Sequence, residues 1–246
     1  MILMKKHLGP GIFRRRMGGR ARLLTALTSL LWLTFFSLAA DAPNQSQSQE
    51  KSHKAPKTAA NPSTAESWQP LFDGKSLTGW KETDFAGRGA VKVESGKLLL
   101  DSGVMTGVTW TNDLPRMNYE ISLEAMRVDG SDFFCGLTFP VGPDPCSFIV
   151  GGWGGGVVGL SSIDSEDAAH NETTQYMNFT NGKWFTIRIK VTKSKIEAWI
   201  DTDKVVNLET EGKKFSIRPE VELSKPLGIA SWSTAAALRN IRIRKL

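Results

Sequence analysis

Alternation of apolar and polar residues is the feature that most restricts the fold of this chain. Every second residue is apolar between residues 185 and 191, and the same pattern appears in residues 119–125 and 241–243. A period of two predicts strands with one buried face. No stretch has a convincing helical period, and turn residues recur at the roughly 8–12-residue spacing of sandwich folds. We therefore expect an all-β domain of two antiparallel sheets.

The apolar phase slips after Ala125, because Met126 and Val128 are also apolar. We expect a bulge or a strand end near Ala125. Residues 94–97, with the sequence Glu-Ser-Gly-Lys, predict a hairpin turn between two short strands.

Two cysteines lie in a candidate hairpin. If its turn is centred between Pro140 and Val141, Cys135 and Cys146 face each other within disulfide range. The alternative is two buried thiols that act as small apolar side chains. The glycine-rich stretch of residues 154–160 that follows has no Gly-Lys-Ser/Thr ending and no predicted helix after it, which argues against a phosphate loop. We expect it to be a strand facing aromatic side chains.

Charge is distributed unevenly along the chain. The 246 residues have a formal net charge of +6, but residues 1–40 hold seven basic residues and no acid, whereas residues 68–246 have a net charge of −1. No concentrated basic surface is available to bind a phosphate backbone, so nucleic acid is excluded as a partner. One histidine in residues 68–246 and two cysteines exclude a multi-histidine or four-thiolate metal centre.

The first 40 residues have the order of a secretory signal: basic, then apolar, then small. Cleavage after Ala39 is one expectation, and retention of residues 23–40 as a membrane anchor is the other. The predicted location is therefore secreted or periplasmic, with membrane contact only through an uncleaved anchor. Residues 41–67 lack apolar residues other than Ala and predict a disordered linker before a domain of residues 68–246.

A polar loop over residues 161–174 holds the only histidine of residues 68–246 and four carboxylates. Proton transfer needs such groups held close together, so His170, Glu172 and Asp164 are candidate catalytic residues. The same oxygens could bind calcium, although the spacing is not that of an EF-hand, and no other cofactor is indicated. The alternative is an ordinary solvated loop.

Seven tryptophans lie in residues 68–246, and for each of them a place in the core is the first expectation. Trp199 is out of phase with its apolar neighbours and is expected to face the other side of its sheet. Trp153 lies among glycines and is the preferred platform for a sugar ring. Asp132, Ser147 and Trp232 are the other candidate substrate-binding residues.

The motif of residues 72–80, FDGKSLTGW, resembles the opening of a bacterial family of secreted 3-keto-disaccharide hydrolases, or 3-keto-glucoside lyase/3-keto-2-hydroxy-glucal hydratase domains. The likeness continues through residues 93–98, 119–124, 181–184 and 238–243, and it covers residues 68–246. The resemblance implies a concanavalin-like jelly roll whose concave sheet faces a saccharide or glycoside. The motif itself is expected to be structural, since Asp73-Gly74 is a turn pair and Trp80 is expected in the core.

This chain departs from the family pattern where charged site residues are usual. The strand of residues 146–153 carries no charge, so the usual arginine and acidic pair are missing there. One hypothesis is an exported hydrolase or lyase for 3-keto-glycosides, in which His170 is the base, Glu172 or Asp164 the acid and Trp153 the platform. The alternatives are a non-catalytic carbohydrate-binding or adhesion module and a purely structural envelope domain.

Overall fold

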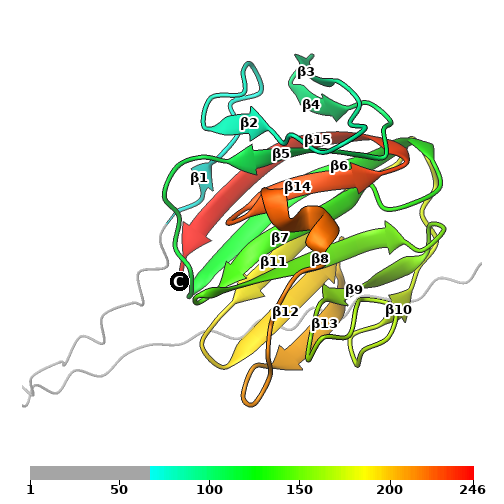
Figure 1. Cartoon of the computed structure of the whole chain (residues 1–246). Coiled ribbons are helices and arrows are strands. Elements are labelled where there is room, and N and C mark those ends of the chain that lie inside the picture. Colours follow the sequence, from blue (N-terminus) through cyan, green and yellow to red (C-terminus); the bar gives the residue numbers. More distant parts are fainter. Residues whose placement is uncertain (1–66) are drawn as a thin grey trace, which may run out of the picture. The chain divides into compact units, whose positions relative to one another are not determined.

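The computed structural model describes residues 67–246, which fold into two stacked antiparallel sheets (Figure 1). The first sheet has the order β13-β12-β11-β6-β15-β4-β3, with β1 paired to β15. Its strands are β1 (Gln69–Pro70), β3 (Val91–Glu94), β4 (Lys97–Leu100), β6 (Tyr119–Gly130), β11 (Trp184–Val191), β12 (Lys195–Ile200), β13 (Asp203–Glu209) and β15 (Thr234–Lys245). This architecture confirms the predicted all-β jelly-roll sandwich.

The second sheet has the order β10-β9-β8-β7-β14-β5-β2. Its strands are β2 (Trp80–Glu82), β5 (Met105–Trp110), β7 (Cys135–Val141), β8 (Asp144–Gly152), β9 (Val157–Ser161), β10 (Gln175–Tyr176) and β14 (Gly228–Trp232). A short 3-10 helix, η1 (Pro219–Ser224), contacts β5 and β14 and is the orange turn in Figure 1.

The alternating residues build the core between the sheets. In β11 the burial pattern alternates as predicted, and Phe185, Ile187, Ile189 and Val191 are all buried. Cys146, Phe148 and Val150 of β8 meet them from the second sheet. The residues between them, such as Ser147 and Ile149, therefore point to the outer face of the second sheet.

The opening motif is structural, as the sequence predicts. Asp73 Oδ1 accepts hydrogen bonds from the backbone N–H groups of Lys75 (2.7 Å) and Ser76 (2.8 Å), which fixes the turn. Trp80 is buried, and its indole N–H donates to the carbonyl of Leu71 at 2.8 Å.

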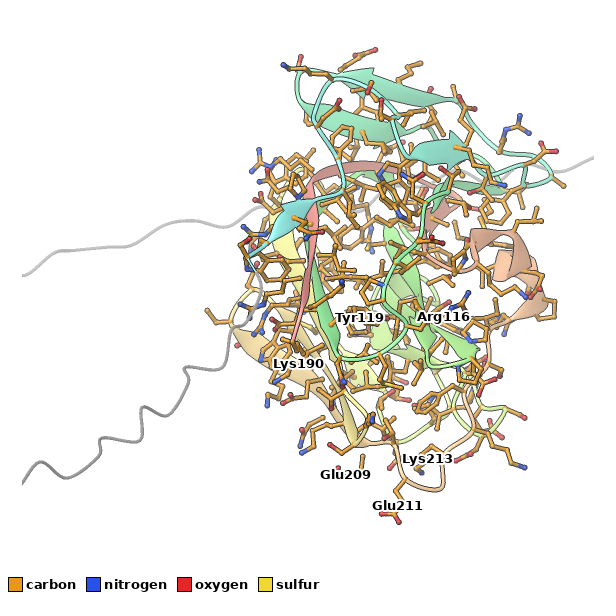
Figure 2. The ribbon with its side chains drawn as sticks, turned by 90° about the vertical axis from the view of Figure 1, so that its left-hand side faces the viewer. Arg116, Tyr119, Lys190, Glu209, Glu211 and Lys213 are labelled. Carbon is orange, nitrogen blue, oxygen red and sulfur yellow. The ribbon has the colours of Figure 1, made fainter. Side chains whose placement is uncertain are left out.

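Tyr119 joins the two sheets through a buried hydrogen bond. Tyr119 lies between the two layers of strands (Figure 2). Its hydroxyl donates a hydrogen bond to the carbonyl of Pro140 in β7 at 2.6 Å. Burial raises the pKa of this hydroxyl well above its ordinary value, so the group stays protonated and remains a donor.

Tyr119→Phe should lower the free energy of unfolding by about 1–2 kcal/mol, because the Pro140 carbonyl loses its donor in a dry interior. Urea denaturation measures this difference. Tyr176→Phe is the matched control, since Tyr176 is 76% exposed and should change stability by less than about 0.5 kcal/mol. Equal effects of the two substitutions would contradict this role for Tyr119.

Several local predictions need correction. The turn of the β7–β8 hairpin lies at Gly142-Pro143, so Cys135 faces Val150 and Cys146 faces Phe139. The cysteines are four positions out of register, roughly 13 Å along the strands, and both are free and buried. Burial raises the pKa of each thiol to about 12.

Two other segments also differ from expectation. Within the glycine-rich stretch of residues 154–160, residues 157–160 lie in a strand as predicted, β9, whereas residues 154–156 form the turn that precedes it. Strand β6 does not end near Ala125: it keeps its phase through a buried Arg127, and the irregularity falls at Val128, where Arg127 faces Ala236 and Asp129 faces Ala235.

The tryptophans are less buried than predicted. Of the seven, Trp80 and Trp110 belong to or pack against the main core. Trp199 faces outward from the first sheet, as expected from its phase.

The predicted signal segment and linker, residues 1–66, lie outside the described residues. Within residues 67–246, no helix has the length and apolar character needed to cross a bilayer.

Candidate functional site

A pocket of about 240 Å³ opens on the outer face of the second sheet, next to η1. Its walls come from β5, β8, β9, β14, the β6–β7 loop, the β8–β9 turn and residues 218–221. The lining residues are Met105, Asp132, Phe133, Ser147, Ile149, Trp153, Ser161, Arg218, Glu220, Val221 and Trp232. All four predicted substrate-binding residues, Asp132, Ser147, Trp153 and Trp232, are therefore part of one pocket.

Aromatic rings form the apolar walls of the pocket. Trp153 is 43% exposed at the β8–β9 turn, where its φ of 50° turns the chain back. Phe133 lies over Gly136, where a Cβ atom would come within 3.0 Å of the ring. With Trp232, these rings offer flat apolar faces of the kind that stack on the C–H faces of a sugar.

Asp132 links the two loops that carry the aromatic residues. Its Oδ1 accepts from its neighbour Phe133 N–H at 2.7 Å, and its Oδ2 accepts from Gly154 N–H at 3.0 Å. The carboxylate thus holds the β6–β7 loop against the turn that bears Trp153, and its remaining lone pairs are available to a ligand.

Arg127 lies behind these loops and is 5% exposed. Its guanidinium donates to the carbonyls of Asp132 (3.1 Å), Phe179 (3.3 Å), Gly151 (3.2 Å) and Gly155 (3.0 Å). Gly151 is required here, because its φ is 79° and a Cβ would lie 2.5 Å from Arg127 Nη2. Arg127 therefore fixes the shape of the turn that positions Trp153.

Hydroxyl groups line the floor of the pocket. The register of β7, β8 and β9 aligns Thr138, Ser147 and Ser161 in one row. Thr138 and Ser147 hydrogen-bond each other at 2.8 Å. Ser161 is 1% exposed, and its Oγ has no hydrogen-bond partner among residues 67–246. Because buried hydroxyls are rarely left unsatisfied, this orphaned group indicates a polar ligand or a bound water.

An ion pair forms the charged wall of the pocket. Arg218 Nη2 donates to Glu220 Oε1 at 2.8 Å, and Arg218 Nη1 donates to Asp167 Oδ2 at 3.0 Å. The hydrogen bond from Arg218 lowers the pKa of Glu220 below 4.5, so this carboxylate is ionised at neutral pH. The sequence gives no signal for Arg218 or Glu220 as site residues, because both lie in a charged segment typical of ordinary protein surface.

The three predicted catalytic residues do not line this pocket. His170 is 65% exposed, and its Nδ1 lies 2.7 Å from Asp167 Oδ1, so it reaches the pocket only through Asp167 and Arg218. Glu172 pairs with Lys213, whose Nζ also lies 3.6 Å from Asp164 Oδ2. The loop therefore brings Asp164 and Glu172 together around a lysine, away from Trp153.

No group of three or more His, Cys, Asp or Glu side chains in the described part of the chain is arranged to hold a metal ion. Asp164 and Glu172 of the polar loop face Lys213 instead, and Asp167 faces Arg218.

The family profile of the 3-keto-alpha-glucoside-1,2-lyase-like domain matches residues 67–244. The chain belongs to this family. No curated protein matches the sequence significantly. Family membership and the sandwich fold support a carbohydrate-related function for this lyase-like domain.

Solved structures with the same fold include carbohydrate-active proteins. The Crh5 transglycosylase in complex with NAG is 14% identical, with a TM-score of 0.51 over 74% of this chain and 84% of that chain. A structure from work on endo-acting O-glycanases of human gut bacteria that initiate mucin breakdown is 16% identical, with a TM-score of 0.50 over 74% and 99%. At these identities the likeness shows the fold of the lyase-like domain alone.

Proposed function

We propose that this lyase-like domain is an exported enzyme that removes the aglycone from 3-keto-glycosides in the pocket beside Trp153. The observation that carries the proposal is the Arg218–Glu220 pair facing the aromatic walls of the pocket, in a chain of this family. Rings would hold the sugar, and the ion pair would supply charge at the reacting atoms.

The chemistry requires little beyond a base and a cationic partner. The ketone at C3 acidifies the C2–H bond, so Glu220 would take the C2 proton while Arg218 stabilises the enolate oxygen on C3. Return of the electron pair forms the C1–C2 double bond and breaks the C1–O bond. The aglycone oxygen then takes the proton from Glu220, which restores the carboxylate and leaves a 2-hydroxy-3-keto-glucal. An ionised Glu220 is in the correct state to accept the first proton.

Trp153→Ala should lower kcat/KM on a nitrophenyl 3-keto-glucoside by about tenfold or more, because the sugar loses its exposed platform. Release of nitrophenol measures the effect. Tyr176→Ala removes an exposed aromatic side chain outside the pocket and should leave kcat/KM unchanged. Equal activity of wild type and Trp153→Ala would contradict the placement of the sugar.

A non-catalytic carbohydrate-binding module is the second candidate, favoured by the absence of charge on strand β8 between Cys146 and Gly152. It predicts that the same ligand binds with Trp153-dependent affinity but is never cleaved. Export rests on residues 1–40, and N-terminal sequencing of the protein from the culture medium or periplasm would test cleavage after Ala39.

A further inference from the structure

Cationic and aromatic side chains cover the outer face of the first sheet, opposite the pocket of the proposed function. We call this set the cationic face, and Figure 2 shows one member, Lys190, on the outer side of this sheet. Its members are six cations, Arg188, Lys190, Lys204, Arg239, Arg242 and Arg244, three carboxylates, Glu120, Glu124 and Glu197, and three tryptophans, Trp68, Trp184 and Trp199.

Positive charge exceeds negative charge on the cationic face. Glu120 is 1% exposed and is flanked by Arg188 and Arg244, and Glu197 is flanked by Lys190 and Lys204. Among the described residues, Glu124 pairs with Arg239 alone. The six cations therefore outnumber the three carboxylates, and the face carries a surplus of positive charge. One cation for each carboxylate would be enough to neutralise these acids.

Tryptophans hold the guanidinium groups in place. Arg188 stacks on Trp199 at 3.6 Å and Arg239 on Trp184 at 4.1 Å. Arg242 and Arg244 both lie 4.8 Å from Trp68. Stacking restricts the rotamers of these side chains, so less entropy is lost when an anion binds.

A hollow of about 340 Å³ interrupts the cationic face between β6, β11 and β15. It forms where the register of β15 slips between Arg239, which faces Glu124, and Arg242, which faces Ser122. The bulge aims Arg242 outward. The polar lining consists of Ser122, Glu124, Thr186, Asn240 and Arg242.

Arg242 is the free charge of this hollow. It is exposed, and within residues 67–246 it forms no ion pair with a carboxylate. Glu124, the one acid in the lining, is already engaged by Arg239 Nε at 2.8 Å and by the Asn240 amide. An anionic group entering the hollow would therefore meet a guanidinium that has no direct carboxylate partner.

We propose that the cationic face is a second glycan-binding site, independent of the pocket beside Trp153, and that it takes an acidic polysaccharide carrying carboxylate or sulfate groups. Arg242 would bind one acidic group in the hollow, while Ser122 and Thr186 would hydrogen-bond sugar hydroxyls. Arg188 and Arg242 lie in one row across the sheet, two strand spacings apart, or about 10 Å. Two guanidinium groups in one row would contact acidic groups at two points along an extended sugar chain.

A membrane surface fits this face less well. The carboxylates of Glu120, Glu124 and Glu197 lie among the cations and break the face into separate positive points, whereas an anionic membrane presents an unbroken sheet of charge. A polymer with spaced charges avoids those carboxylates.

Affinity electrophoresis of the full-length chain tests the proposal with polygalacturonate, alginate and chondroitin sulfate as acidic polymers and dextran as the neutral one. At least one acidic polymer should retard the protein, and dextran should not. Arg242→Ala should weaken that retardation by about tenfold, because it removes a charge-assisted contact. Arg88→Ala is the matched control: it removes the same charge from a residue paired with Asp84 outside the cationic face, and it should bind normally.

Three results would overturn the proposal: no retardation by any acidic polymer, equal weakening by Arg88→Ala, or Arg242-dependent binding only to phosphatidylglycerol vesicles. Trp153→Ala should leave this binding intact while lowering turnover of the 3-keto-glucoside, which separates the two sites. Circular dichroism of Arg242→Ala checks that the fold is retained, and Arg242→Lys should recover part of the binding through its charge.

Discussion

Replacing Arg127 by methionine is expected to lower the free energy of unfolding by about 3–5 kcal/mol, because up to four carbonyl groups behind the pocket lose their donor. Methionine fills a similar length but donates no hydrogen bond. The melting temperature should fall by about 10 °C for a domain of this size. Thermal and urea denaturation measure both quantities.

Arg127→Met should also weaken ligand binding, because the carbonyls that Arg127 holds, those of Gly151 and Gly155, flank Trp153. Arg127→Lys should be intermediate, since lysine keeps the charge but cannot form the planar fork. Arg116→Met is the control, because Arg116 is exposed and should change stability by less than about 0.5 kcal/mol. A fully stable Arg127→Met variant would show that the turn does not depend on the guanidinium.

Glu220→Gln is expected to lower kcat on a 3-keto-glucoside by about 10²–10⁴-fold, because the amide cannot accept the C2 proton. KM should change little if the rings of Trp153 and Trp232 bind the sugar. In the wild-type enzyme, activity should be retained above the pKa of Glu220 and be lost as pH falls through it, so the acid limb should lie below the ordinary pKa of a glutamate.

Glu222→Gln is the matched control for Glu220→Gln. Glu222 also lies on η1 but pairs with Lys225 and does not line the pocket, so its variant should retain full activity. The sequence-based assignment predicts a different outcome, in which His170→Asn and Glu172→Gln abolish turnover and Glu220→Gln does not. Stopped assays on these four variants decide between the two assignments.

The all-β fold could be predicted from the alternation of apolar and polar residues, because successive side chains of a strand point to opposite faces and only one face of each sheet is buried in the core. Residues 185–191 show this directly, and their alternation is the burial pattern of β11. Arg127 could not be predicted in the same way. A charged side chain at an inward position looks like a break in phase, and only the carbonyls of distant loops explain why it is buried.

The pairing register of the β7–β8 hairpin could not be predicted from the local sequence either. Pro140 and Pro145 face each other across the β7–β8 hairpin, and the turn lies two residues later than expected, which moves Cys146 four positions away from Cys135. Nothing in the composition of that segment distinguishes the two registers.

Part of the candidate site was predictable from residue type. Trp153 among glycines was the expected sugar platform and Asp132 a candidate substrate-binding residue, and both line the pocket. Arg218 and Glu220 lie at least 65 residues after Trp153 in the chain, so only the folded structure brings them to the same walls.

Proton NMR of the full-length protein with an aryl 3-keto-glucoside in D₂O is the most direct test of the central claim. We expect the aryl alcohol to be released and the C2 proton to be lost to solvent as the 2-hydroxy-3-keto-glucal forms. The corresponding unoxidised glucoside should stay intact, because its C2–H bond is not acidified. Release of the aryl alcohol at equal rates from both glucosides, or from neither, would contradict the account.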